Sequence, residues 1–309
     1  MSGDDVSAAP GAALRTLVAG VVDYAGLFPP ASLDMPAAVR NFADYRASAD
    51  AWMLGRFVVP VARLGEWTSA MHALPASDSL SWSGARICAL LTGEYAQEAD
   101  AITAFNALGA FGVLIDVVEG RAATPDAVLA TAAAMPDDVM LYCEVTHRDD
   151  PMPLLQAVRS AGVRAKIRTG GVTPDAFPPP EEIVRFLRRC IETGVTAKAT
   201  AGLHHPLSGE YRLTYAPDAV RGVMYGYLNV FLAAAAMRAG APDSVATEML
   251  TLTDASAIAI SAASLSVCGF EITNAILAAT RTDALVAFGS CSFREPVDEL
   301  AVLYASRAS

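Results

Sequence analysis

The sequence lacks the excess of basic residues that proteins use to bind nucleic acids or anionic membrane surfaces. Its 309 residues carry a formal net charge of −11, and the sequence pI is about 4.8. Because the nucleic-acid backbone and an anionic bilayer both attract positive charge, we expect neither as a partner. The acidity is ordinary for a soluble enzyme that acts on a small molecule.

The cysteines form no disulfide or metal-binding pattern. They are scattered without CxxC spacing, and most of them lie in apolar runs. Such residues are typical of the reduced core of an intracellular protein. The five positions are Cys88, Cys143, Cys190, Cys268 and Cys291.

Long uninterrupted apolar runs are missing as well. The longest, near residues 223–237 and 255–270, are broken by polar residues and glycine, whereas a membrane-spanning helix needs about 20 apolar residues. The N-terminus opens with acidic residues rather than with the basic region of a signal peptide. There is no internal repeat with a period of about 20–50 residues. We therefore expect a cytoplasmic protein with no membrane partner.

What the sequence does contain is a regular alternation of short apolar runs and amphipathic, alanine-rich segments. Continuously apolar strands separated by helices are typical of a parallel sheet that is buried on both faces. Eight such units favour an α/β fold, a (β/α)8 or TIM barrel, over an open doubly wound sheet. We predict strands at 20–27, 54–59, 85–91, 112–117, 138–145, 163–168, 195–200 and 284–290, and helices near 36–49, 62–74, 94–108, 124–134, 151–161 and 180–193.

Residues 206–283 interrupt this alternation between the seventh and eighth predicted strands. They contain no clear strand, and we interpret them as a loop followed by helices near 218–239, 242–253 and 255–280. The prediction is a single barrel domain over residues 1–309 that carries a helical insertion at 206–283. An insertion at this place could form a lid or a subunit interface, so we expect a homo-oligomer.

Polar side chains gather at the predicted carboxyl ends of the strands, where barrel enzymes have their active sites. A lysine amine is protonated at neutral pH, but a dry interior and a second ammonium nearby both favour its neutral form. A neutral amine can attack a carbonyl carbon and form a Schiff base, while a nearby carboxylate transfers the proton. The predicted catalytic residues are Lys166, Lys198, Asp116 and Asp23.

Six short motifs follow one another along the predicted strands: DYAGLFPPA from Asp23, FVVPVARL at 57–64, LIDVV at 114–118, YCEVTH at 142–147, AGVRAKIRTGG at 161–171 and VTAKATAGL at 195–203. As an ordered set they resemble deoxyribose-phosphate aldolase and its class I aldolase relatives. This resemblance implies a barrel lyase that needs no cofactor. It also implies that Lys166 forms the Schiff base and Lys198 lowers the pKa of Lys166. Asp116 would be the proton-transfer carboxylate, and Asp23 would be an orienting carboxylate.

The sequence departs from that family at several places near the predicted site. Arg168 falls inside the first lysine motif, where small hydroxyl residues are usual, and FGSCSF replaces a phosphate-binding loop. A guanidinium can hold a carboxylate or phosphate with two hydrogen bonds, or it could pair with Glu144. The predicted substrate is a small carbonyl compound, with or without a phosphate or carboxylate group. The predicted substrate-binding residues are Arg168, Glu144, His204, His205, Gly170, Gly171, Ser290 and Tyr24.

Two other functions remain open from the sequence. One is a metal-assisted hydrolase or isomerase that uses His204 or His205 with Asp116 and Glu144, although no HxH or HxxxH spacing supports it and we predict no metal site. The other is a non-catalytic barrel that binds a ligand or partner through the insertion at 206–283. Separately, Cys291 would need one of the two histidines as a base to act as a nucleophile.

Overall fold

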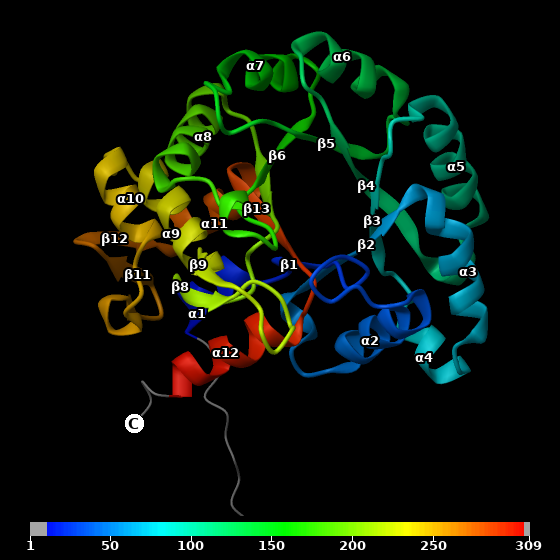
Figure 1. The fold of residues 1–309 in the computed structure, drawn as a ribbon, viewed down its shortest axis with the longest axis horizontal. Coiled ribbons are helices and arrows are strands. Elements are labelled where there is room, and N and C mark those ends of the chain that lie inside the picture. The colour runs from blue at the N-terminus through cyan, green and yellow to red at the C-terminus, as the bar shows by residue number, and fades with distance from the viewer. Residues whose placement is uncertain (1–10, 306–309) are drawn as a thin grey trace, which may run out of the picture.

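The computed structural model describes residues 11–305, and its central feature is a closed barrel of eight parallel strands in the order β1-β13-β7-β6-β5-β4-β3-β2 (Figure 1). The predicted TIM barrel is thus confirmed. The predicted domain also includes residues 1–10 and 306–309, which lie outside the described residues. The barrel strands are β1 (Val22–Tyr24), β2 (Leu54–Pro60), β3 (Arg86–Leu90), β4 (Leu114–Arg121), β5 (Met140–Glu144), β6 (Arg164–Arg168), β7 (Ala197–Thr200) and β13 (Leu285–Ser290).

Helices surround the barrel, and the six helices predicted outside residues 206–283 are all present (Figure 1). Local signals explain several of their starts, since Asp34 accepts a hydrogen bond from the Ala37 amide and Thr124 does the same for Ala127. The helices outside the predicted insertion are α1 (Ala12–Val18), α2 (Met35–Ala47), α3 (Leu64–Ala73), α4 (Ala76–Leu80), α5 (Tyr95–Leu108), α6 (Pro125–Ala134), α7 (Met152–Ser160), α8 (Pro180–Thr193) and α12 (Arg294–Ala305). Short 3-10 helices lie at Ala51–Met53, Val61–Arg63, Ala110–Gly112, Pro174–Ala176 and Ala255–Ala257.

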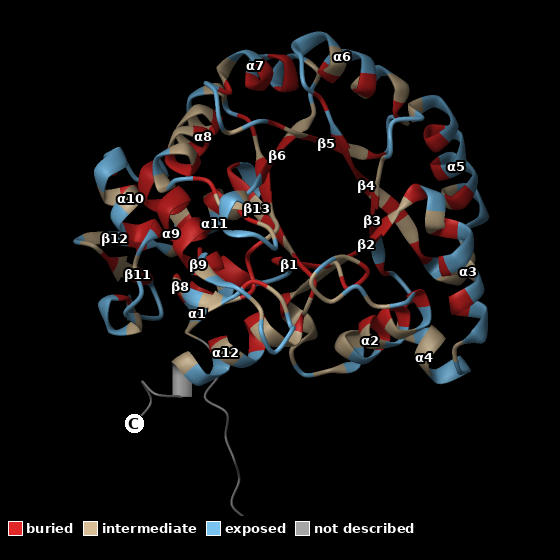
Figure 2. Ribbon diagram, viewed as in Figure 1, coloured by how far each residue is buried: buried red, intermediate tan, exposed pale blue. Residues whose placement is uncertain are grey.

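The apolar core has two parts. The larger part lies between the strands and the inward faces of the helices, as the buried residues in Figure 2 indicate. The smaller part lies inside the barrel and consists of Val58, Cys88, Val117 and Tyr142. Because these few side chains do not fill the interior, the barrel has room for charged residues and a cavity.

The prediction of a purely helical insertion at 206–283 is wrong, because the segment also contains two small antiparallel sheets. Its strands are only two to four residues long and show no clear alternation of apolar and polar residues. The sequence pattern therefore does not predict them. The sheets consist of β8 (Gly209–Arg212) with β9 (Arg221–Met224), and of β10 (Ala259–Ile260), β11 (Ser264–Val267) and β12 (Phe270–Thr273). The helices of the segment are α9 (Tyr227–Arg238), α10 (Asp243–Leu250) and α11 (Asn274–Asp283).

Helix α9 explains why this segment is so rich in small apolar residues. It is buried from Tyr227 to Met237 and packs against β13 and the neighbouring helices α8, α10 and α11. It therefore covers the outside of the barrel as the other barrel helices do, and its alanines allow the surrounding elements to approach closely.

Candidate active site

The chain contains only two lysines, and both lie inside the barrel. Lys166 on β6 and Lys198 on β7 are register partners, and Glu144 on β5 is the partner of Lys166. Aligned residues of neighbouring parallel strands point to the same side of the sheet. Lys166 is 6% exposed and Lys198 is 1% exposed. The remaining residues of the Lys and Arg total are all arginines, so the two lysine amines differ chemically from every other basic side chain of that set.

One buried carboxylate joins the two amines. Glu119 on β4 places Oε2 2.8 Å from the Lys166 Nζ and Oε1 2.6 Å from the Lys198 Nζ. Lys166 also lies 2.9 Å from Glu144 Oε2, and Lys198 lies 2.6 Å from Asp23 Oδ2. We call these five residues the lysine cluster. The two amines therefore meet at one buried carboxylate.

The charges of the lysine cluster hold both amines in the protonated form. Burial alone would lower the pKa of Lys166, but Glu119 and Glu144 outweigh it and raise that pKa above its usual value. Burial is likewise outweighed at Lys198, where Asp23 and Glu119 raise the pKa well above the ordinary value. The prediction that crowding of the two amines lowers the pKa of Lys166 is wrong, because carboxylates outnumber amines in the cluster.

Asp23 is held in position by the neighbouring strand. Its Oδ1 accepts a hydrogen bond from the Arg56 amide at 2.8 Å, which leaves Oδ2 free to contact Lys198. A Cβ atom at Gly55 would lie 2.4 Å from the same Oδ1. Glycine is therefore required at position 55 for this close approach.

The assignment of Asp116 to the catalytic site is wrong. Asp116 lies near the beginning of β4 and forms an ion pair with Arg56 on β2, with Nε and Oδ1 2.7 Å apart. Arg86, the first residue of β3, lies 3.9 Å away from it. These contacts place Asp116 at the amino-terminal end of the barrel. The candidate site lies at the opposite, carboxyl end of the strands.

The sequence analysis missed Glu119 because of a bulge in β4. The register with β3 shifts between the pairs Ile87 with Ile115 and Cys88 with Val117, which leaves Asp116 as the extra residue. Strict alternation from an inward Asp116 would turn Glu119 outward, and the bulge reverses this. The sequence does contain a signal for Glu119. This carboxylate directly precedes Gly120, at which a strand longer than the predicted one could end.

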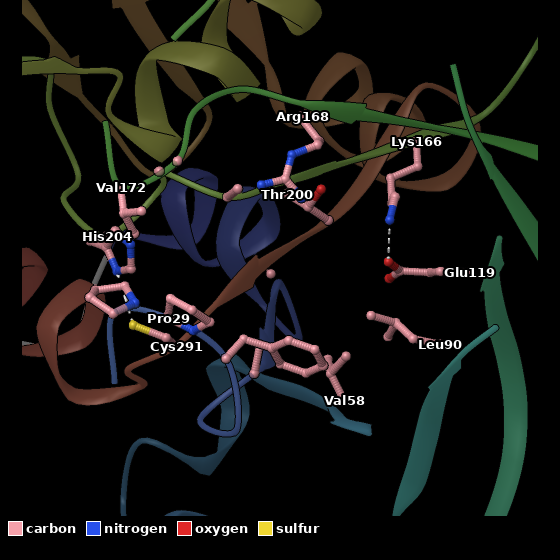
Figure 3. Close-up of a pocket in the computed structure, with 17 residues that line it drawn as sticks. Pro29, Val58, Leu90, Glu119, Lys166, Arg168, Val172, Thr200, His204 and Cys291 are labelled. Atoms are coloured by element: carbon pink, nitrogen blue, oxygen red, sulfur yellow. Dashed lines mark hydrogen bonds and ion pairs between the residues drawn. The ribbon is translucent and has the colours of Figure 1, made fainter. Parts of the chain in front are cut away.

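A cavity of about 250 Å³ lies above the lysine cluster, at the carboxyl end of the barrel (Figure 3). Figure 3 shows the Lys166 amine directed toward Glu119 on one side of the cavity, and His204 beside Cys291 on the other. Apolar parts of its wall come from Phe28, Pro29, Val58 and Leu90. Lys198 lies deeper and does not line the cavity, so Lys166 is the lysine that a bound molecule can reach.

Several predicted substrate-binding residues line this cavity. Arg168, Gly171 and His204 do so, and Ser290 lies beside His204 with its Oγ 3.4 Å from Nδ1. Within residues 11–305 the Arg168 guanidinium has no ion-pair partner, and Glu144 pairs with Lys166 and Arg121 instead. The alternative that Arg168 neutralises Glu144 is therefore wrong.

Other predicted substrate-binding residues do not reach the cavity. Tyr24 points outward from β1 into the aromatic core around Phe42 and Phe57, because neighbouring Asp23 points inward. Gly170 packs under the Phe177 ring, which leaves no room for a side chain. The His205 ring stacks on Tyr211 with centroids 3.5 Å apart.

The residues of the predicted metal-assisted alternative are not brought together. His204 contacts Glu295 and His205 contacts Glu299, both on α12, while Glu144 and Asp116 form the ion pairs described above. Across residues 11–305 no group of three or more His, Cys, Asp or Glu residues could hold a metal ion. The structure thus offers no support for that ligand set.

Neither a protein-family model nor a curated protein matches the sequence of this chain. Within the described part of the chain, no helix is both long and apolar enough to cross a membrane. The class of protein is therefore defined by the fold and the site alone. It is a TIM barrel, an architecture common among enzymes, with a charged cluster beneath a cavity at its carboxyl end.

Proposed function

We propose that this protein is a lyase of the class I aldolase type, in which Lys166 forms a Schiff base with a small carbonyl substrate. The observation that carries the proposal is the position of the only two lysines of the chain. Both amines contact the same buried carboxylate, and one of them faces a cavity at the carboxyl end of the barrel. The predicted homo-oligomer and cytoplasmic location stay predictions, and the chemistry does not depend on them.

The lysine cluster can supply the proton transfers of this reaction. The Lys166 ammonium has Glu119 and Glu144 within hydrogen-bond distance as acceptors for the proton it must lose. The neutral amine attacks the carbonyl carbon, the carbonyl oxygen leaves as water, and the resulting iminium accepts the electron pair of the breaking carbon–carbon bond. Glu119 is the proposed proton shuttle, in the role that the resemblance assigned to Asp116. Lys198 and Lys166 lower the pKa of Glu119 and so keep it ionised, and Asp23 contacts Lys198 on its other side.

The size and charge of the cavity support a small anionic substrate. A volume of about 250 Å³ lies below the range of roughly 300–1,000 Å³ that is usual for drug-sized ligands. Lys166 and Arg168 are two residues apart on β6 and both line the cavity, which separates their backbone positions by about 6–7 Å. A carbonyl compound with a carboxylate or phosphate a few bonds from the carbonyl would span this distance.

Reductive trapping tests the proposed Schiff base. The protein is treated with sodium borohydride together with acetaldehyde, propanal, hydroxyacetone or pyruvate, and the adduct is located by peptide mass spectrometry. We expect an adduct at Lys166 with at least one of these compounds. The background is low because Lys198 and the terminal amine are the only other amino groups of the chain. Trapping at the terminus alone with all four compounds would rule the proposal out.

Adduct formation is expected to become faster as the pH rises. Since Glu119 and Glu144 raise the pKa of Lys166, only a small fraction of the amine is neutral near pH 7. That fraction, and with it the initial trapping rate, increases about tenfold per pH unit below the pKa. Cyanoborohydride trapping between pH 7 and pH 9, followed by intact mass, measures the slope.

The variant Glu144→Gln links this pH dependence to the cluster. Removing one of the two carboxylates lowers the pKa of Lys166, so the profile is expected to move to lower pH and trapping at pH 7 to become faster. Arg121→Gln is the matched control, because it removes the other, exposed partner of Glu144 and leaves both carboxylates beside Lys166. A shift of the Glu144→Gln profile to higher pH would contradict the electrostatic argument.

A further inference from the structure

A second group of reactive side chains lies at the opposite side of the same cavity. Cys291 directly follows β13, and its Sγ lies 3.7 Å from His204 Nδ1 and 3.5 Å from the Tyr215 hydroxyl. Glu295 on α12 places Oε2 3.4 Å from the same His204 nitrogen and accepts a hydrogen bond from Tyr215 at 2.9 Å. We call Cys291, His204, Glu295 and Tyr215 the thiol cluster. None of them belongs to the lysine cluster.

The geometry of the thiol cluster pairs the Cys291 sulfur with the His204 imidazole, at 3.7 Å. Burial opposes the charge on His204, but its contacts with Cys291 and Glu295 outweigh burial and raise the pKa of His204 to about 9. The imidazole is therefore protonated at neutral pH, and an adjacent imidazolium is the usual means of stabilising a thiolate. The other titratable groups near His204 are Tyr215 and His205, and His205 is engaged by Glu299.

The remaining cysteines lie in surroundings that keep them as thiols. Burial raises the pKa of Cys143 to about 11, and it raises those of Cys88 and Cys190 as well. Cys268 is more exposed than Cys291, yet burial and the charge of Glu248 raise its pKa to about 11. Cys268 is thus the more exposed of the two but has no histidine beside its sulfur in the described residues, whereas Cys291 is buried and contacts His204. The two cysteines therefore serve as an internal comparison.

We propose that Cys291 is a second nucleophile of this cavity. With His204 as its proton partner, Cys291 adds to the carbonyl carbon of a small aldehyde. In this step the Cys291 thiolate forms a sulfur–carbon bond as the carbonyl π bond breaks. The carbonyl oxygen takes the proton of the His204 imidazolium, and the product is a neutral thiohemiacetal. The step needs no oxidant or further reactant, and it reverses when His204 takes the proton back. The cavity thus has two separate nucleophiles, Lys166 and Cys291, each of which can react with a carbonyl carbon.

Selective alkylation tests the proposed thiolate. The full chain is treated with limiting iodoacetamide at pH 6.5, and the labelled cysteines are quantified by peptide mass spectrometry. We expect Cys291 to react at least about tenfold faster than Cys268, because only a thiolate reacts readily at this pH. Equal or faster labelling of Cys268 in the wild-type protein would overturn the proposal, and this comparison requires no variant to fold.

Two variants connect the reactivity to its cause and separate it from the lysine chemistry. His204→Gln should slow Cys291 labelling about tenfold or more, whereas His205→Gln, the matched neighbour that faces Tyr211 and Glu299, should not. In Lys166→Met, which cannot form a Schiff base there, propanal should still protect Cys291 from iodoacetamide. An unchanged rate in His204→Gln, or no protection by propanal, counts against the second nucleophile without affecting the proposed aldolase chemistry.

Discussion

Replacing Lys166 with methionine is expected to reduce catalysed exchange of α-protons to the rate without enzyme, a loss of about a thousandfold or more. An iminium makes the neighbouring C–H bond acidic, so a Schiff-base enzyme exchanges these protons with solvent even when its full substrate is unknown. Methionine keeps much of the length of the lysine side chain but has no amine. The assay is ¹H NMR of acetaldehyde or hydroxyacetone in D₂O with purified protein.

Lys198→Met is the comparison for this experiment. Lys198 does not line the cavity, and its amine contacts Glu119 and Asp23. We expect this variant to slow exchange through misplacement of Glu119, while the borohydride adduct remains at Lys166. If Lys166→Met still exchanges α-protons and its adduct lies at Lys198, the assignment of the nucleophile is wrong.

Replacing Glu119 with glutamine is expected to lower the free energy of unfolding by about 3–5 kcal/mol. Glu119 is 4% exposed and contacts both lysine amines. The amide is similar in shape, but it removes the negative charge and directs an N–H₂ donor at one of two buried ammonium groups. Urea unfolding followed by circular dichroism measures the change, and fitting the slope establishes that the native states are comparable.

Asp116→Asn is the matched control for this stability measurement. It also removes a strand carboxylate that pairs with a cation, but Asp116 and Arg56 are each about one-third exposed. Solvent screens such a pair, so the expected loss is about 1 kcal/mol or less. Equal losses in the two variants would mean that Glu119 is not the centre of the buried charge cluster.

The arrangement of strands and helices was largely predictable because local pattern and tertiary environment agree. The predicted strands at 54–59 and 163–168 lie within a residue or two of the observed β2 and β6, although both contain basic residues. Helix α8 was predicted from its proline and two glutamates at the first turn, and its bounds are the observed ones. The small sheets of 206–283 escaped prediction because two- to four-residue strands have no measurable period.

The site residues were predictable where the alternation within a single strand defines them. The prediction failed where the register between two strands decides which residue faces inward. Lys166, Lys198 and Asp23 could be identified because strand alternation places a polar residue inside the barrel. Glu119 was missed because a single bulge in β4 turns it inward, and Asp116 was assigned wrongly because it lies at the amino-terminal end of the same strand. Tyr24 was misassigned for a related reason, since it adjoins an inward residue and must point out.

The sequence by itself determined the barrel and the presence of two unusual lysines within it, because apolar periodicity and strand ends are local properties of the chain. Only the tertiary structure decided which carboxylate joins the amines, that both amines are held protonated, and that Cys291 meets His204. These properties depend on distances between strands and helices far apart in the sequence. Electrostatic interactions change strongly over such short distances, so no local pattern contains them.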